Sequence, residues 1–287
     1  MSRARPTYFV TEKLTAGSSM MRIGLAEQMC AAGENVRVIT QTDPALGNAR
    51  DAIVVFVKNF DSSIVANTRQ NDNKVIWAPV DFFAVNPDVP DCSLFDGAIF
   101  PNSRAQKDFT PLFQPGIQST VIGGYADPRW RCAKTWRFRL AYMGHRKNLD
   151  ERYRNIKGLC TEYFGKSRRD LNRFFRRSSR YSCHFSVTPE NSPRFLYKPD
   201  TKLTGAAACG ANIILSKNPA HLDVLDPDYP YYTQTDIESV AAMVKFARAT
   251  YRKPEWKRGL EMMRAVREKT TRERVAKAHS EFFARFE

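Results

Sequence analysis

The sequence predicts an α/β protein with two domains, each built around a parallel β-sheet. Short apolar segments alternate with helix-sized segments along the chain, and this order is typical of parallel sheets whose strands are joined by helices. The length of 287 residues allows two domains of about 130 residues, each with its own core. The hydrophobic fraction of 43% and the aromatic fraction of 12% are those of a folded chain and exclude global disorder.

The first half of the chain begins with a βαβ unit. A strand over 8–11 is followed by a helix with Leu25 and Met29 on one face, and Gly33 ends that helix before a strand over 36–40. Further short apolar strands are expected at 52–57, 74–78, 97–100 and 119–122.

The second half continues the alternation. A strand and turn over 139–145 precede a helix that carries Tyr153, Ile156, Leu159 and Tyr163 at helical spacing. The elements expected after it are a strand at 181–187, a small-residue helix and strand within 198–216, a helix at 219–225, a strand-like segment at 229–234, an amphipathic helix over 237–247 and polar terminal helices.

The most informative stretch is KPDTKLTGAAACGANIILS at 198–216. We expect Pro199 to open its helix, because the ring presets φ and the missing N–H has no partner in a first turn. Lys198 and Lys202 flank that helix N-terminus, where free N–H groups and the helix dipole favour anions, so we expect a diphosphate to bind there. An ordinary helix N-terminus with two solvated lysines is the alternative.

This stretch resembles the donor-site signature of GT-B-fold glycosyltransferases, in which a small-residue helix ends in a Cys-Gly or Ala-Gly step before a buried strand. The run 209–214 matches that pattern without a gap. Common retaining members also carry two glutamates eight residues apart, and the aligned positions here hold Tyr197 and Gly205. The remaining Lys-Pro-x-x-Lys pattern is similar to that of a less familiar set of bacterial glycosyltransferase-like proteins.

The resemblance implies two Rossmann-like domains that face each other across a cleft. It divides the chain into an N-terminal acceptor-side domain at 1–128, a nucleotide-sugar domain at 129–268 and a terminal helix at 269–287 that packs back on the first domain. The connection 123–128 resembles the hinge of this family, and 139–145 resembles the first strand and turn of its second domain.

The resemblance also places the loop after the strand at 139–143 near the donor phosphates. His145 or Arg146 could there neutralise the charge that builds on the leaving diphosphate in a transfer without a metal. A solvated turn with incidental basic residues is the alternative. The donor-binding residues implied in this way are Gly144, Arg146, Arg194, Lys198, Thr201, Lys202 and Thr204.

Candidate groups of the first domain follow its strands, at the end where open α/β sheets hold their ligands. Asp81 is the first choice for the base that accepts the acceptor hydroxyl proton in an inverting transfer, and Glu12 is the runner-up. An aspartate in such a loop also commonly caps a turn. Gly17, Ser18 and Ser19 open the first helix and could bind an acceptor or a phosphate through backbone N–H groups, although a plain N-cap explains them equally well.

No metal and no other cofactor is expected. Asp226 and Asp228 formally match a DxD metal motif, but the proline between them favours a turn. The six cysteines form no CxxC pair and no Cys/His metal spacing, which suits reduced thiols in the cytosol. No window reaches about 18 uninterrupted apolar residues, so we expect a cytoplasmic protein that is at most peripheral to the inner face of a membrane.

The net charge of +15 is concentrated between 129 and 180, a segment that contains 17 Lys or Arg residues and four Asp or Glu residues. Such a segment attracts phosphate-bearing partners: a nucleotide sugar, an anionic membrane, an acidic glycan or a nucleic acid. Interleaved aromatics at 173–177 fit a nucleic-acid site. However, Leu171, Phe174 and Phe175 fall at helical spacing, which favours a helix with a buried face and solvated or membrane-facing arginines.

The sequence therefore predicts a metal-independent glycosyltransferase that moves a sugar from a nucleotide-diphosphate donor to a glycan, lipid or other acceptor. A catalytically reduced relative that binds a nucleotide, a glycan or an anionic surface is the first alternative, favoured by the missing glutamates and the short first domain. A basic nucleic-acid-binding α/β protein is the third interpretation, and it rests on charge alone.

Overall fold

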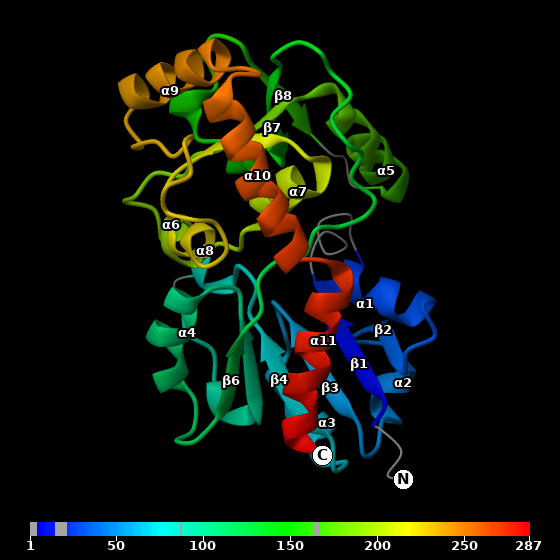
Figure 1. Cartoon of the computed structure of the whole chain (residues 1–287). Coiled ribbons are helices and arrows are strands. Elements are labelled where there is room, and N and C mark those ends of the chain that lie inside the picture. The colour runs from blue at the N-terminus through cyan, green and yellow to red at the C-terminus, as the bar shows by residue number, and fades with distance from the viewer. Residues whose placement is uncertain (1–4, 15–21, 87, 164–166) are drawn as a thin grey trace. The chain divides into compact units, whose positions relative to one another are not determined.

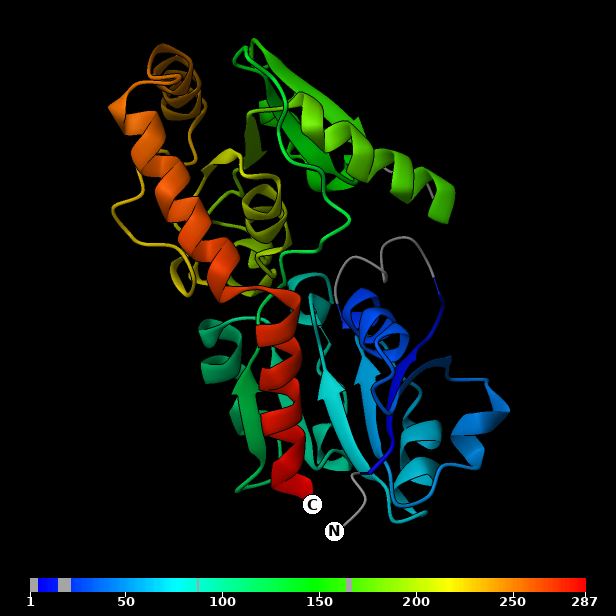
Figure 2. The same cartoon turned by 45° about the vertical axis from the view of Figure 1, so that its right-hand side comes forward.

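The computed structural model describes residues 5–14, 22–86, 88–163 and 167–287. The chain divides into two compact units (Figures 1 and 2). Unit 1 comprises Met1–Gly124, Tyr197–Pro199 and Glu273–Glu287, and unit 2 comprises Tyr125–Leu196 and Asp200–Arg272. Each unit is an α/β structure around a parallel sheet, which confirms the predicted fold class.

The sheet of unit 1 has six parallel strands in the order β2-β1-β3-β4-β5-β6. Its central strand β3 has the sequence IVVFV and is buried at every residue, as expected for a parallel strand covered on both faces. The expected strands are all present, with bounds that differ by at most a residue. They are β1 Thr7–Thr11, β2 Val36–Thr40, β3 Ile53–Val57, β4 Lys74–Ala78, β5 Gly97–Phe100 and β6 Gln118–Val121.

Helices cover both faces of this sheet. Phe9 of β1 packs on His279 and Phe283, whereas the adjacent Val10 belongs to a core cluster that contains Val65 and Ala105 from two other helices. Neighbouring side chains of a strand point to opposite faces, so the C-terminal helix covers one face and those two helices cover the other. The helices are α1 Arg22–Ala31, α2 Pro44–Gly47, α3 Ser62–Arg69, α4 Ser103–Phe109 and α11 Arg272–Phe283, with short η2 Phe82–Ala84, η3 Cys92–Leu94, η4 Thr110–Leu112 and η8 Ala284–Phe286.

The sheet of unit 2 has four parallel strands in the order β10-β9-β7-β8. The strands are β7 Leu140–Gly144, β8 Leu159–Tyr163, β9 Cys183–Ser186 and β10 Asn212–Leu215. The helices are α5 Arg168–Arg177, α6 Pro193–Tyr197, α7 Thr201–Cys209, α8 Pro219–Leu222, α9 Ile237–Ala249 and α10 Pro254–Lys269, with short η5 Arg146–Asn148, η6 Glu151–Tyr153 and η7 Ser178–Arg180.

The helix expected over Tyr153 to Tyr163 is wrong, because that segment forms η6 and then the strand β8. Gly158 adopts a left-handed backbone conformation (φ +87°), which a continuing helix cannot contain. The chain then pairs with the exposed edge of β7 along all five residues. Helical spacing of apolar residues was present, but the available sheet edge decided the conformation.

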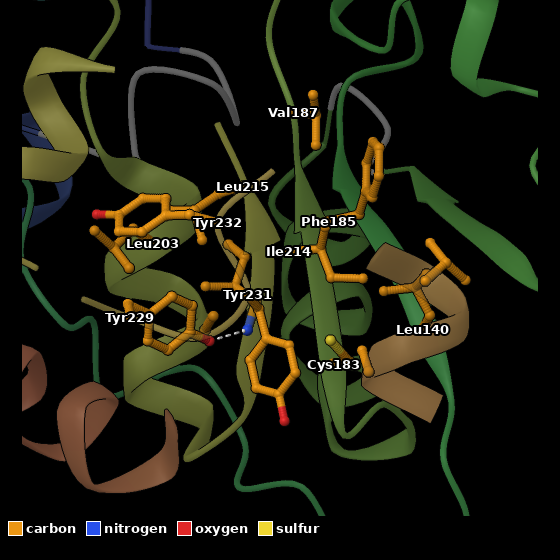
Figure 3. Close-up of a cluster of buried hydrophobic side chains, with 14 of the residues drawn as sticks. Leu140, Cys183, Phe185, Val187, Leu203, Ile214, Leu215, Tyr229, Tyr231 and Tyr232 are labelled. Carbon is orange, nitrogen blue, oxygen red and sulfur yellow. Dashed lines mark hydrogen bonds between the residues drawn. The ribbon is translucent and has the colours of Figure 1, made fainter. Parts of the chain in front are cut away.

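The core of unit 2 gathers side chains of three strands and of the helices α7, α9 and α10. Figure 3 shows part of this core, with Tyr229 beside the small-residue helix. The backbone N–H of Ile213 donates to the Tyr229 hydroxyl at 2.8 Å (Figure 3). The expected strand at 229–234 is reduced to a single bridge between Leu215 and Tyr232, because the tyrosines here fill the core instead of extending the sheet.

Candidate functional site

The candidate site of unit 2 lies at the carboxyl edge of its sheet, where α7 begins. The helix starts at Thr201, with Asp200 as its N-cap, so the expectation that Pro199 opens it was wrong by two residues. Pro199 precedes the cap and does not contribute to the first turn. The helix ends where predicted, at Gly210, whose left-handed conformation (φ 62°) suits a glycine after a C-terminus.

Lys202, in the first turn of α7, lies against the end of β7. Its ammonium nitrogen is 5.2 Å from the centre of the Tyr142 ring, within the range of a cation–π contact. A Cβ at Gly144 would lie 2.8 Å from the Tyr142 hydroxyl and 3.1 Å from Cε of Lys202, so a larger residue would displace the ends of these two side chains. The absence of a side chain at Gly144 thus allows the Tyr142 hydroxyl and the Lys202 side chain to approach the backbone.

Further polar groups surround this point. The Tyr142 hydroxyl donates to the carbonyl oxygen of His145 at 3.0 Å, and burial raises the pKa of Tyr142, so the hydroxyl stays protonated. The Arg194 guanidinium donates to the carbonyl oxygen of Lys147 at 3.4 Å. Its positive charge lowers the pKa of Tyr142, but by less than burial raises it. His145 caps η5, where its ring Nδ1 accepts from the Lys147 N–H at 3.4 Å. The fold thus gathers Gly144, His145, Arg194 and Lys202 at one sheet edge.

The other predicted donor residues have different surroundings. The Thr204 side chain is buried, and its hydroxyl donates to the carbonyl oxygen of Thr201 at 3.2 Å, within the first turn of α7. Arg146 is exposed in η5. Lys198 belongs to unit 1, where its carbonyl oxygen accepts from the Asn102 side chain at 3.4 Å. Thr204 is thus bonded within α7, Arg146 directly follows His145, and Lys198 is a residue of unit 1.

His221 is a buried residue of this region that the sequence analysis missed. Its Nδ1 lies 2.8 Å from the carbonyl oxygen of Ser216, the residue after β10. Burial first, and then the charge of Lys202, lower the pKa of His221 to about 4, so the ring is neutral at pH 7. No motif surrounds this histidine, and its proximity to Lys202 arises only when β10 and α7 come together.

Tyr197 and Gly205, the positions aligned with the paired glutamates, are both filled by packing. A Cβ at Gly205 would lie 2.7 Å from Cζ2 and 2.9 Å from Cε2 of the Trp130 indole. In unit 1, the Tyr197 ring packs on Phe109 at 4.7 Å between centroids, and its hydroxyl donates to Asp108 at 3.0 Å. The indole therefore leaves no room for a side chain at position 205, and a packed tyrosine occupies position 197.

The two carboxylates proposed as bases lie at the carboxyl edge of the unit 1 sheet, each held by a residue that follows β3. Asp81 forms an ion pair with Lys58 at 2.8 Å. Glu12 accepts a hydrogen bond from the Asn59 side chain at 3.1 Å. This bond, with the charge of Lys13, lowers the pKa of Glu12 and makes it a weaker base. The loop 17–19, the third predicted group of this unit, lies outside the described residues.

The described residues contain no group of three or more His, Cys, Asp or Glu side chains arranged to hold a metal ion. The Asp226 side chain accepts from the Asp228 N–H at 2.8 Å, which is the turn expected for this motif. All six cysteines are free thiols. Among the helices of the described ranges, none has the length and apolar character needed to cross a bilayer.

Comparison with known proteins finds similarity in structure alone. No protein-family model matches the chain, and no curated protein matches its sequence. A glycosyltransferase from Rickettsia africae has a TM-score of 0.67 at 8% identity, covering 99% of each chain. Anabaena HepE, solved with UDP and glucose, has a TM-score of 0.65 at 8% identity, covering 98% of this chain and all of its own.

A putative UDP-N-acetylglucosamine 2-epimerase from Listeria monocytogenes has a TM-score of 0.59 at 8% identity, covering 98% of each chain. The fold of this chain is therefore that of GT-B glycosyltransferases, as its sequence resemblance implied. Because the same fold occurs in a protein described as an epimerase, the chemistry has to be argued from the site residues.

Proposed function

We propose that this protein is a glycosyltransferase that moves a sugar from a nucleoside-diphosphate donor to a hydroxyl group of a glycan or lipid-linked acceptor. The observation that carries the proposal is the place of Lys202, in the first turn of α7 and against Gly144 at the end of β7. Helix N-termini at this edge favour phosphate groups, because free N–H groups and the helix dipole attract anions. The full-length likeness to glycosyltransferases supports this choice.

The protein's own cations would stabilise the leaving diphosphate. When the bond between the sugar and the diphosphate breaks, negative charge builds on the leaving oxygen, and cations placed in advance stabilise that charge. Lys202 and Arg194 supply such charges at the edge of β7, and His145 is a third polar group at the same edge. We therefore propose a transfer that requires no divalent metal, with Lys198 as a further donor contact.

Asp81 is the proposed base that accepts the acceptor hydroxyl proton, because it follows β4 at the edge where open α/β sheets hold their ligands. Glu12 is the runner-up, and the hydrogen bond from Asn59 lowers its pKa. Asp81 lies in the loop after β4, and its ion pair with Lys58 fixes the carboxylate in one orientation. An inverting transfer would use this carboxylate, whereas a retaining transfer needs no such base.

One observation favours a second candidate function, that of a binding protein without turnover. The Trp130 indole fills the space beside Gly205, and Tyr197 is committed to packing on Phe109. Neither glutamate position of the retaining pattern thus holds a carboxylate, and the indole leaves no room for one at position 205. A relative that had lost transfer would keep nucleotide binding through Lys202 and would show no donor turnover.

Titration calorimetry with UDP tests the proposed donor site. The charge-assisted bonds of Lys198 and Lys202 contribute about 1.5–3 kcal/mol each, so the variant Lys198→Ala/Lys202→Ala should bind UDP at least about tenfold more weakly. The matched control is Lys245→Ala/Lys257→Ala, which removes two exposed charges from α9 and α10 of the same unit. Equal UDP affinity in all three folded proteins would remove the donor-site assignment.

Two further measurements separate the functions. Release of UDP from UDP-glucose, in the presence and absence of candidate acceptors, distinguishes an enzyme from a protein that binds UDP without turnover. A titration with oligonucleotides at increasing salt addresses the third interpretation, since binding by charge alone weakens steeply with salt. Binding of oligonucleotides without any binding of UDP would favour a nucleic-acid-binding protein over both proposals.

A further inference from the structure

A second basic pocket lies in unit 2, outside the candidate donor site. It has a volume of about 570 Å³ and is formed between α5 and the chain segment that precedes β7. We call it the α5 pocket, and its lining residues are Arg129, Arg131, Arg169, Asn172, Phe175 and Arg176. None of them belongs to the residues gathered around Lys202.

The sequence of α5 builds one wall of this pocket. The helix RRDLNRFFRR carries five arginines and one aspartate over ten residues. Leu171, Phe174 and Phe175 are buried, and their spacing of three and four residues defines the face that packs on the unit. Arg169 and Arg176 are exposed and two turns apart, so their guanidinium groups lie on the same side of the helix.

The segment before β7 builds the opposite wall and is fixed in place. The Arg129 guanidinium forms an ion pair with Asp127 at 2.6 Å and lies 4.8 Å from the centre of the Phe175 ring. The backbone N–H of Arg131 donates to the Ser178 hydroxyl at 3.1 Å. Since Ser178 is fully buried directly after α5, this bond holds Arg131 against the helix end. The pocket is therefore formed by the folded unit itself.

The pocket carries positive charge without matching carboxylates. The guanidinium groups of Arg131, Arg169 and Arg176 form no hydrogen bond and no ion pair with any residue in the described part of the chain. The carboxylate of Asp127 is engaged by Arg129. The Asp170 carboxylate, on the same helix, interacts mainly with the Ser167 hydroxyl, which lowers its pKa. The charges of Arg173 and Arg169 lower that pKa by smaller amounts. Three like charges that converge on one pocket repel each other unless an anion lies between them.

We propose that the α5 pocket binds a phosphate ester or a diphosphate group. A phosphate monoester carries about two negative charges at pH 7 and three acceptor oxygens, whereas a carboxylate carries one charge. Guanidinium groups donate pairs of parallel hydrogen bonds to phosphate, and the amide of Asn172 adds a neutral donor on the same face of α5. This site is additional to the proposed donor site and does not depend on the transfer reaction.

The same phosphate chemistry has two sources, and two arms of one experiment distinguish them. The first arm is titration calorimetry of the full chain with sodium pyrophosphate. The second arm is co-sedimentation with phosphatidylcholine vesicles that contain or lack phosphatidic acid, whose headgroup is a phosphate monoester. The pocket variant is Arg169→Gln/Arg176→Gln, and both side chains are exposed, so the fold should be retained.

The control variant is Arg173→Gln/Arg180→Gln, which removes two exposed arginines from α5 and η7 that do not line the pocket. Both variants lower the net charge by two. We expect the pocket variant to weaken binding by about tenfold or more in at least one arm, because charge-assisted bonds are lost, and the control to change it by less than about threefold. Binding of pyrophosphate alone identifies a soluble ligand, and binding of phosphatidic acid vesicles identifies a lipid headgroup.

Pyrophosphate could also occupy the proposed donor site. The comparison is therefore repeated with Lys202→Ala in all three proteins, which removes that contribution. A failure of UDP to bind concerns the site at α7, whereas this comparison concerns the α5 pocket. Equal weakening in the pocket and control variants would show that general charge, not this pocket, attracts the anion, and would overturn the proposal. So would the absence of binding in both arms.

Discussion

The contact between Trp130 and Gly205 allows a quantitative prediction for Gly205→Ala. The added methyl group would lie 2.7 Å from Cζ2 and 2.9 Å from Cε2 of the indole, distances at which one of the two groups must move. The indole cannot move easily, because only 7% of Trp130 is exposed and its ring packs on Phe174 and Phe175 at 5.4 and 5.1 Å between centroids.

The expected magnitude follows from two opposing effects. Overpacking a filled core costs about 1–3 kcal/mol, whereas replacing a helical glycine by alanine gains about 0.5–1 kcal/mol. Gly205→Ala should therefore lower the free energy of unfolding by up to about 2.5 kcal/mol. In a Trp130→Phe background the clashing atoms are absent, so the same change should be neutral or stabilising by up to about 1 kcal/mol.

The double-mutant cycle is measured by urea unfolding, with hydrogen exchange of β9 as a local reporter of unit 2, since the two units can unfold in separate steps. Gly47→Ala in α2 is the control, because no atom lies within 4 Å of its added Cβ. An equal effect of Gly205→Ala in both backgrounds would refute the inference that the indole closes this glutamate position.

Three other predictions concern the proposed chemistry and the buried histidines. If Asp81 is the base, Asp81→Asn should lower turnover by roughly 10²–10⁴ with UDP affinity nearly unchanged, and near-normal turnover would leave Asp81 as the ion-pair partner of Lys58. Transfer should continue in EDTA, and a loss that Mg²⁺ or Mn²⁺ restores would contradict the metal-free proposal. Burial lowers the pKa of His184 and of His221 to about 4, from an ordinary value of 6.5. The unfolded chain therefore binds more protons than the folded chain between these two pH values. The contribution of each histidine to the free energy of unfolding should be complete above pH 6.5 and should fall toward pH 4 by about 1.4 kcal/mol per pH unit. His184→Leu should remove the contribution of one histidine to this pH dependence. An unchanged dependence of the unfolding free energy on pH, measured by urea unfolding, would count against this reasoning.

The sequence by itself determined the elements whose signals are local. The strand β4 has the predicted bounds, because KVIWA is an apolar run between turn residues and is buried in the sheet from Val75 onward. Gly210 ends α7 as predicted, since a left-handed residue is needed there and glycine adopts it without a Cβ penalty. The resemblance carried by 209–214 also predicted the fold that the solved structures confirm.

Only the tertiary structure decided the features that depend on a distant partner. Leu159–Tyr163 became a strand because β7 offered a free edge, although its apolar spacing suited a helix. The polar groups gathered at the end of β7 come from three separate segments, and Trp130 closes position 205 from a segment 75 residues earlier in the chain. A sequence pattern records the period of a segment and its turn residues. It carries no signal for the side chain that folding places against them, and that side chain determines which groups meet in a site.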